Sequence, residues 1–291
     1  MKIAFIGLGN MGGPMAANLV AKGFEVAGFD VAEPAKQAAA ENGIIVHDTV
    51  AAASAGADVV ITMLPNDALV RTVIAEARGE VAAGATFIDS STIAVDAARE
   101  IGAELSEAGF GFIDAPVSGG IFGATEATLA FMVAGDEQVF EAHRRLFEAM
   151  GRSITYCGAL GNGQAVKACN NMILAIHQVA LSEAMVMSER LGVDPQVFYD
   201  VVSNATGSSW SLTKNCPVPG PVPTSPANND FKPGFATALM LKDLRLAMQA
   251  AESTGTNTVL GKIVAQLYEQ LVEDGHAGED FSVIINAVRA H

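Results

Sequence analysis

The first thirty residues carry the pattern that most restricts what this chain can fold into. Residues 2–7 (KIAFIG) read as a short apolar strand, a glycine-rich turn then opens a helix, and residues 24–30 (FEVAGFD) read as a second strand. The turn has glycine at positions 7, 9 and 12, and the second strand ends at Asp30. A G-x-G-x-x-G sequence between a strand and a helix is the fingerprint of a dinucleotide-binding βαβ unit.

Each position of this fingerprint has a mechanical reason. Gly7 permits a tight turn, Gly9 lets the backbone approach a pyrophosphate, and Gly12 lets the helix pack closely on the sheet. A carboxylate at Asp30 would accept hydrogen bonds from ribose hydroxyls and repel a 2′-phosphate, which favours NAD over NADP. A glycine triplet alone could be a plain turn, but here the strand, the helix and the terminal Asp agree. We therefore expect an NAD site formed by Asp30 and the loop residues Gly7, Leu8, Gly9, Asn10, Met11 and Gly12.

The alternation of strands and helices continues after the fingerprint. Four further apolar runs read as strands, and helical segments such as 66–78 and 93–108 lie between most of them; the runs are residues 56–66, 84–92, 109–120 and 127–135. This order predicts a Rossmann-type, doubly wound and mostly parallel sheet. Ligands of such sheets bind beyond the carboxyl ends of the strands.

Polar and glycine-rich residues gather at those predicted strand ends. They are Leu64-Pro65-Asn66, Ser90-Ser91-Thr92 and Val117-Ser118-Gly119-Gly120. Ordinary turns are the alternative explanation, but the repeated position at strand ends favours a binding role. Ser118, Gly119 and Gly120 could expose successive backbone N–H groups to an anion such as a carboxylate. A flexible loop would have the same sequence, so that choice stays open here.

A long helix is predicted from Gly161 to Leu191. The segment has no proline, it has no glycine after Gly163, and its apolar residues recur at helical spacing. At about 1.5 Å per residue it would span roughly 40 Å. Lys167 is the only Lys, Arg, Asp or Glu between Gly161 and Ser182, and Asn171 follows one turn later. A lone ammonium on an apolar helix is costly to bury without a task, so we expect Lys167 to be catalytic.

The second half of the chain loses the strand signals. Helices are expected over residues 195–202, 237–253 and 259–273, with a last short helix after Phe281. We therefore predict two domains, a dinucleotide-binding domain over residues 1–162 and an all-α domain over residues 163–291 that begins with the long helix. Residues 216–226 contain five prolines and read as a rigid lid or a linker. Trp210, the only tryptophan, is expected to form a substrate wall, with a packing aromatic as the alternative.

Charge limits the partners. The formal net charge is −15, with only 17 Lys and Arg residues, which argues against a nucleic-acid partner. An anionic ligand would need a few well-placed cations against that field. Lys242 is such a candidate besides Lys167, although it could equally be a solvated residue of an amphipathic helix.

Several classes of site and location are not expected. No apolar run reaches the roughly 18–20 residues of a membrane span, and no signal-peptide pattern is present, so we expect a cytoplasmic protein without membrane contact. The three cysteines show no paired spacing, which fits reduced thiols. No histidine, His291 included, has another ligand at metal-binding spacing, so no metal site is expected.

The motifs together resemble a known family. GLGNMGGPMAANL, DSSTI, DAPVSGG, GNGQAVKACNN and KDLRLA, in this order and spacing, are similar to the signature stretches of the β-hydroxyacid dehydrogenases, and they cover the whole chain. The proline-rich loop, the NN-x-F-x-x-GF run and the DFS near the end most resemble the branch that acts on 3-hydroxyisobutyrate.

The resemblance implies residue roles. Lys167 would be the catalytic group, Asn171 would orient the substrate, and Ser118, Gly119 and Gly120 would hold its carboxylate. The remaining matches would line the cofactor, with Lys242 reaching either the cofactor or the substrate acid; they are Leu64, Pro65, Asn66 and Thr92. Asp30 followed by Val31 agrees with the NAD-using branch, because NADP users of the family place an Arg after this strand.

The expected reaction is NAD-dependent oxidation of a short β-hydroxy acid, such as 3-hydroxyisobutyrate to methylmalonate semialdehyde in valine catabolism. Relatives that act on L-serine, D-glycerate or tartronate semialdehyde, or 3-hydroxypropionate are the alternatives. A non-catalytic NAD-responsive binding protein would require loss of Lys167 or Asn171 or a blocked pocket, and an imine or ketone reductase on the same scaffold commonly replaces the lysine. Apolar residues around most of the long helix suggest burial against a second subunit, giving a homodimer or homotetramer.

Overall fold

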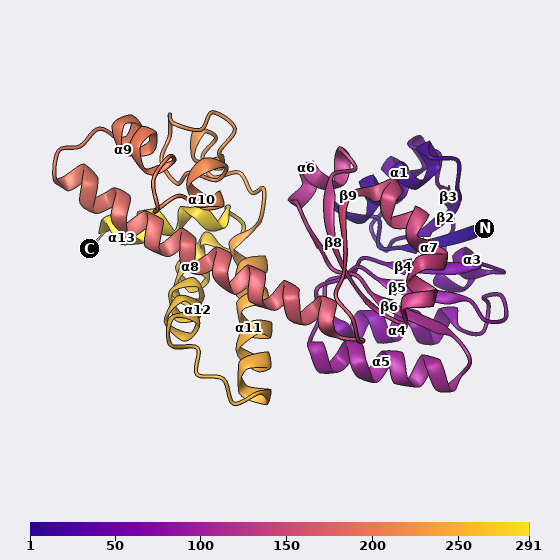
Figure 1. The fold of residues 1–291 in the computed structure, drawn as a ribbon. Coiled ribbons are helices and arrows are strands. Elements are labelled where there is room, and N and C mark those ends of the chain that lie inside the picture. The colour runs from indigo at the N-terminus through magenta and orange to yellow at the C-terminus, as the bar shows by residue number, and fades with distance from the viewer. Residues whose placement is uncertain (291) are drawn as a thin grey trace. The chain divides into compact units, whose positions relative to one another are not determined.

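The chain folds into two compact units (Figure 1). The structure is a computed structural model and describes residues 1–290, so His291 lies outside the described residues. The first unit is Met1–Lys167 and the second is Ala168–His291. The division falls inside helix α8 (Asn162–Arg190), the long helix expected from the sequence. The domain boundary between residues 162 and 163 stays a prediction.

A single sheet organises the first unit. Within residues 1–290 it has nine strands, eight of them in the spatial order β3-β2-β1-β4-β5-β6-β8-β7, with β9 beside β8. The bounds are β1 (Lys2–Ile6), β2 (Glu25–Phe29), β3 (Ile45–Val46), β4 (Val59–Thr62), β5 (Thr86–Asp89), β6 (Gly111–Asp114), β7 (Val117–Ser118), β8 (Leu129–Gly135) and β9 (Gly151–Tyr156). The strands from β3 to β6 are parallel, whereas β8 is antiparallel to β6 and β7. The predicted doubly wound, mostly parallel sheet is confirmed.

Helices cover both faces of this sheet. They are α1 (Gly12–Ala21), α2 (Glu33–Glu41), α3 (Val50–Ser54), α4 (Asp67–Ala77), α5 (Val95–Glu107), α6 (Gly120–Thr125) and α7 (Glu137–Met150). Each face of the sheet has its own hydrophobic core, and successive side chains of β1 point alternately into the two. Ile3 and Phe5 belong to the core under α1 and α7, whereas Ala4 and Ile6 belong to the core under α4 and α5. Both faces are therefore buried, which explains the continuous apolar runs of these strands.

Three details of the sheet differ from the sequence-based expectation. Residues 109–120 form two strands, since Pro116, which has no backbone N–H, falls between β6 and β7. Strands β3 and β9 were not predicted. The first has only two residues, and the second exposes alternate side chains at the edge of the sheet, so neither carries a strong apolar signal.

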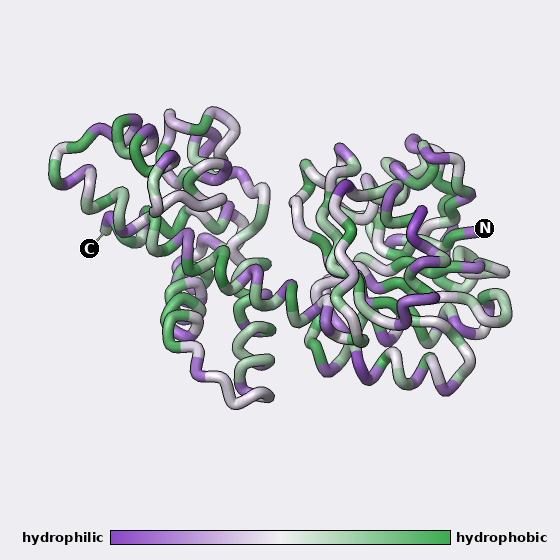
Figure 2. The backbone as a smooth tube through the Cα atoms, viewed as in Figure 1, coloured by the Kyte–Doolittle hydropathy of each residue, from purple (hydrophilic) through white to green (hydrophobic). Residues whose placement is uncertain are grey.

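The second unit is helical, as expected. Its elements after α8 are α9 (Pro195–Val202), α10 (Trp210–Thr213), a 3₁₀ turn η1 (Pro226–Asn228), α11 (Thr237–Ser253), α12 (Val259–Leu271), a π turn η2 (Val272–His276), a 3₁₀ turn η3 (Phe281–Val283) and α13 (Ile284–Ala290). The helix expected to reach Glu273 ends as an α-helix at Leu271 and continues as the π turn, in which Gly275 has a φ of 98°. Apolar stretches recur along α8 and α12 (Figure 2).

A buried carboxylate ties the irregular segments of the second unit together. Asp280 is 1% exposed and accepts hydrogen bonds from the Asn215 side chain at 3.1 Å, from the Gly234 and Phe235 N–H groups at 3.1 and 3.0 Å, and from the Ser282 hydroxyl at 2.7 Å. These donors precede the proline-rich loop, α11 and α13. A carboxylate with this many donors can be buried because each oxygen is satisfied.

Candidate active site

The glycine loop after β1 has the geometry that its sequence predicts. Gly7 has a φ of +96°, and a Cβ there would lie 2.3 Å from the Met63 carbonyl oxygen. A Cβ on Gly12 would lie 1.8 Å from the Gly7 carbonyl oxygen. A Cβ on Gly9 would meet no atom of the described residues within 4 Å. Packing therefore requires the first and third glycines, whereas the second borders open space, as a loop that takes a pyrophosphate needs.

Asp30 stands at the end of β2, directly beside this loop. Its carboxylate accepts the Leu8 N–H at 2.7 Å and the Ala32 N–H at 2.8 Å. The side chain is half-buried. A carboxylate has about four acceptor positions, so two remain for ribose hydroxyls. The residues of the loop and Asp30 thus fit the adenosine half of a dinucleotide.

The loops after β4 and β5 lie side by side at the same edge. The Leu64 N–H donates to the Ser91 hydroxyl at 2.8 Å, which joins the two predicted cofactor segments. Asn66 caps α4 by accepting the Leu69 N–H at 2.9 Å. Because β2, β1, β4 and β5 are neighbours in the sheet, their carboxyl ends bring Asp30, the glycine loop, Leu64-Pro65-Asn66 and Thr92 to one edge.

The Ser118-Gly119-Gly120 segment runs from the last residue of β7 to the first residue of the short helix α6. Gly119 and Gly120 have φ values of 138° and 62°, a region that favours glycine. The Asn18 side chain donates to the Ala124 carbonyl at 2.7 Å and so fixes α6 against α1, the helix of the glycine loop. Two glycines are therefore required by the backbone here, and carboxylate binding by this segment stays a prediction.

Lys167 is buried, at 7% exposure, near the start of α8. The first turn of that helix is held by Asp114 at the end of β6, which accepts the Gly161 N–H at 2.7 Å and the Gln164 N–H at 3.0 Å. Burial raises the pKa of Asp114 to about 6, and the charge of Asp89 adds to this, while the two backbone hydrogen bonds oppose it. No role was predicted from the sequence for Asp114 or Gln164. The signal that could have identified them is a polar residue at the end of an apolar strand and another at the start of an apolar helix.

The second unit carries the other three predicted residues. Asn171 is 2% exposed, its amide nitrogen donates to the buried Asp243 carboxylate, and its oxygen accepts the Asn170 side chain at 2.9 Å. The Lys242 ammonium lies 3.6 Å from the same carboxylate. Asn171 and Lys242 are thus brought together through Asp243, a residue without a predicted role. Trp210 lies on α10 with 55% of its surface exposed.

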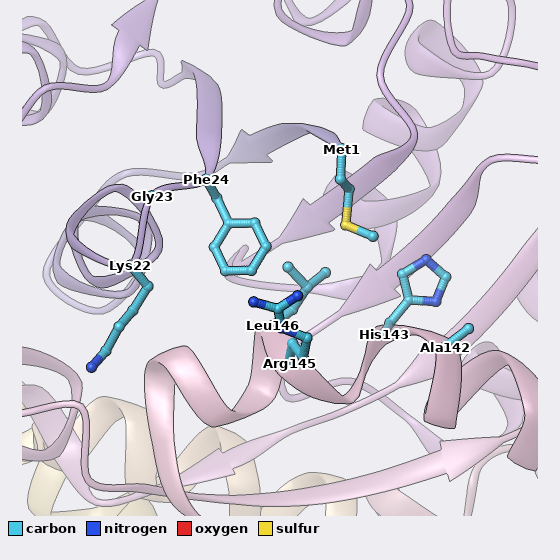
Figure 3. A pocket seen from close by; sticks show the side chains of 8 residues that line it. All are labelled: Met1, Lys22, Gly23, Phe24, Ala142, His143, Arg145 and Leu146. Carbon is cyan, nitrogen blue, oxygen red and sulfur yellow. The ribbon is translucent and has the colours of Figure 1, made fainter.

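A cavity of about 410 Å³ in the first unit lies away from these residues. Figure 3 shows its lining, which includes Met1 and Phe24 at the starts of β1 and β2, and Arg145 of α7. It therefore opens at the amino ends of the parallel strands, opposite to the edge where the glycine loop lies. Doubly wound sheets bind their ligands at the carboxyl ends, so this cavity is not the cofactor site.

Among residues 1–290 no group of three or more His, Cys, Asp or Glu side chains could hold a metal ion. Over the same described range, no helix is long and apolar enough to cross a membrane.

Two family models match the chain over nearly its full length. The model described as the NAD binding domain of 6-phosphogluconate dehydrogenase matches residues 2–158. The model described as NAD-binding of NADP-dependent 3-hydroxyisobutyrate dehydrogenase matches residues 161–288.

Individual proteins agree with these matches. A protein of Mycobacterium tuberculosis named probable 3-hydroxyisobutyrate dehydrogenase is 52% identical over 288 residues, which cover 99% of this chain and 98% of the relative. The NAD-dependent L-serine dehydrogenase of Pseudomonas aeruginosa is 40% identical, covering 97% of this chain and 96% of the relative. A solved structure of the M. tuberculosis 3-hydroxyisobutyrate dehydrogenase with L-serine matches at a TM-score of 0.94 and 52% identity, covering 99% of each chain.

This chain belongs to the β-hydroxyacid dehydrogenase family. The dehydrogenase is NAD-dependent, and its Rossmann-type sheet followed by a helical region is the architecture expected from the sequence. The resemblance drawn from the motifs is confirmed. The roles of the individual site residues stay predictions.

Substitutions of Gly12 and Gly9 should affect different properties, the first the stability of the fold and the second the binding of the cofactor. Gly12→Ala should lower the free energy of unfolding by about 1–3 kcal/mol or more, because its Cβ collides with the Gly7 carbonyl. Gly9→Ala should change that free energy by less than about 0.5 kcal/mol, but weaken NAD binding by about tenfold or more. Urea denaturation and NAD titration of both variants check this. Equal loss of stability in the two variants would contradict it.

The Asp114 carboxyl makes stability depend on pH. Its pKa is 3.8 in an unfolded chain and about 6 in the fold, so the folded state binds more protons between these values. Wild-type stability should therefore fall as pH rises through this window, by about 3 kcal/mol from this group. Asp114→Asn lacks the titration, so the unfolding free energy of the variant minus that of wild type should increase over the same window. Chemical denaturation at several pH values measures it, and a difference that stays constant would refute it.

Proposed function

We propose that the dehydrogenase oxidises 3-hydroxyisobutyrate to methylmalonate semialdehyde with NAD, as in valine catabolism. The observation that carries this is the 52% identity to the probable 3-hydroxyisobutyrate dehydrogenase of M. tuberculosis, over 99% of the chain. L-Serine is the second candidate substrate. The relative at 40% identity is named an L-serine dehydrogenase, and the solved structure at 52% identity contains L-serine.

The candidate substrates share one chemical framework. 3-Hydroxyisobutyrate, L-serine, D-glycerate and 3-hydroxypropionate all have a primary alcohol, a carboxylate, and a carbon between them. They differ only in the substituent on that carbon, which is a methyl, an ammonium, a hydroxyl or a hydrogen. The groups proposed to bind the alcohol and the carboxylate would therefore serve all four acids.

The proposed roles follow the resemblance and the burial of each residue. NAD, when bound, accepts the hydride. Lys167 takes the hydroxyl proton in the oxidation and returns it in the reverse direction. Asn171 orients the substrate from one turn further along α8, and the backbone of Ser118, Gly119 and Gly120 holds the carboxylate. Trp210 is proposed as a wall of the substrate pocket.

Asp30 supports NAD in preference to NADP. Two of its acceptor positions are used by the Leu8 and Ala32 N–H groups, and about two remain for ribose hydroxyls. The negative charge would repel the 2′-phosphate of NADP, and Val31, which is 89% exposed, supplies no cation to attract it. We propose that Lys242 contacts the cofactor or the substrate acid.

A homo-oligomer is proposed for the same enzyme. The second unit exposes large apolar side chains on α9 and α12; they are Val197, Val201, Val259, Leu260, Ile263 and Leu267, each at least 39% exposed. Large exposed apolar side chains on a helix face are typical of association sites, and a second copy of the chain is the proposed occupant. The sparse, unpaired cysteines support a cytoplasmic location.

Initial rates of oxidation test the proposed function. The four acids would be compared with NAD and with NADP at about pH 7 and about pH 9, since a lysine base works better at alkaline pH. A preference for 3-hydroxyisobutyrate with NAD is expected. Faster turnover of L-serine would replace the substrate and keep the mechanism. No turnover of any of the four acids, with NAD still bound, would refute the proposed enzymatic function.

Lys167→Ala tests the proposed base. Turnover should fall by about 10²–10⁴-fold, because the proton transfer loses its partner, while NAD binding should change little. Lys22→Ala is the control and should keep full activity, because Lys22 is exposed and lines the cavity at the amino ends of the strands. Loss of NAD affinity in Lys167→Ala would instead assign this lysine to the cofactor.

A further inference from the structure

The Gln164 side chain joins α8 to the segment that follows β5. Its Nε2 donates to the Ser91 carbonyl at 2.8 Å, and its Oε1 accepts the Ile93 N–H at 3.2 Å. The residue is 1% exposed. These two peptide groups flank Thr92, so the amide clasps the backbone on both sides of a residue proposed to line the cofactor.

The base of this clasp is rigid. The Gln164 and Gly161 N–H groups both donate to the Asp114 carboxylate. A Cβ on Gly163 would lie 2.3 Å from the Met132 carbonyl oxygen and 2.7 Å from Asp114 Oδ2. The first turn of α8 therefore lies so close to the sheet that only glycine fits at position 163. The hydrogen bond to Asp114 and the close packing at Gly163 consequently fix the backbone of Gln164, from which its side chain extends.

The clasp also extends along the sheet edge. The Ser91 hydroxyl accepts the Leu64 N–H at 2.8 Å, so the loop after β4 is fixed to the same segment. Lys167 follows Gln164 by three residues on α8 and therefore lies on the same side of the helix, about one turn on. A continuous set of hydrogen bonds thus connects the segments carrying Leu64 and Thr92 to the helical turn that presents Lys167.

We propose that Gln164 is a positioning residue that sets the distance between the cofactor-lining segment at Thr92 and the Lys167 ammonium. The inference rests on the proposed role of Lys167. Gln164 acts through its neighbours and contacts neither substrate nor cofactor. Hydride and proton transfer require both partners in register, and a displacement of about 1 Å costs roughly 10²-fold in rate.

The chemistry of the contact explains why an amide is needed. One side-chain group must donate to a carbonyl and accept from an N–H at once, and a glutamine amide does both. Leucine fills the volume but leaves both buried peptide groups without a partner. Glutamate keeps the acceptor for Ile93 N–H but places a second oxygen against the Ser91 carbonyl. The two substitutions therefore remove two contacts and one contact respectively.

The same helix offers a matched control. Gln178 lies on α8, is 0% exposed, and neither side-chain polar atom has a hydrogen-bond partner within the part of the chain that the structure describes. Gln178→Leu makes the same change of volume and polarity as Gln164→Leu without removing a hydrogen bond. Any effect of replacing a buried glutamine as such would appear in both variants.

Steady-state kinetics per NAD-binding site test the proposal on wild type, Gln164→Leu, Gln164→Glu and Gln178→Leu. We expect kcat of Gln164→Leu to fall by about 10–100-fold with KM for the hydroxy acid nearly unchanged. Gln164→Glu should recover part of the rate, and Gln178→Leu should match wild type. Hydride transfer should become more rate-limiting, so the isotope effect on kcat with substrate deuterated at the alcohol carbon should increase. A kcat within twofold of wild type, or an equal loss in Gln178→Leu, would overturn the proposal.

Amide hydrogen exchange gives a readout that does not depend on activity. In Gln164→Leu the peptide covering residues 90–94 should exchange about tenfold faster or more, and in Gln178→Leu it should not. Unchanged exchange of that peptide would overturn the proposal, whether or not the wild-type enzyme turns over any of the tested acids. Absence of turnover in the wild type would by itself refute only the proposed function. Where Gln164→Leu does not fold, the same measurements on Gln164→Glu decide.

Discussion

The buried carboxylate of Asp114 is the contact on which the proposed catalytic half of the first unit depends. It stands at the carboxyl end of β6 and takes the free N–H groups at the start of α8. A helix begins with N–H groups that lack partners and a partial positive charge, and a carboxylate satisfies both. Burial opposes this by raising the pKa of the group to about 6. In return, the two hydrogen bonds fix the start of α8, the helix that carries Lys167.

Close packing supplies the second constraint at the same edge. A Cβ on Gly12 would collide with the Gly7 carbonyl and one on Gly163 with the Met132 carbonyl, so α1 starts in close contact with the glycine loop and α8 in close contact with β8. Neither helix can slide without a collision, because each contact involves backbone atoms. The glycines of GLGNMGG and GNGQ thus have the same mechanical function, although only the first motif has a recognised pattern.

The sequence predicted what is encoded locally. The glycine turn, the apolar strands and Asp30 lie within thirty residues of one another, and helix periodicity located α8, α9 and α11 almost to the residue. The contacts of Gln164 with Ser91 and of Asn171 with Asp243 join residues 73 and 72 positions apart, and no periodicity reports such pairs. Strands β3 and β9 were missed for a different reason: β3 has only two residues, β9 mixes polar and apolar residues, and both are held by their neighbours in the sheet.

Asp243 illustrates how an acidic protein can use few cations. Its buried carboxylate receives the Asn171 amide and faces the Lys242 ammonium at 3.6 Å, so one negative group orients both polar neighbours. An asparagine amide can present either its oxygen or its nitrogen to a ligand. Here the nitrogen donates to Asp243 and the oxygen accepts from Asn170, which fixes the orientation of the amide. The roles proposed for Lys167, Asn171 and the Ser118 segment concern only the alcohol and the carboxylate that the candidate acids share. Under that proposal, discrimination among a methyl, an ammonium and a hydroxyl requires other residues.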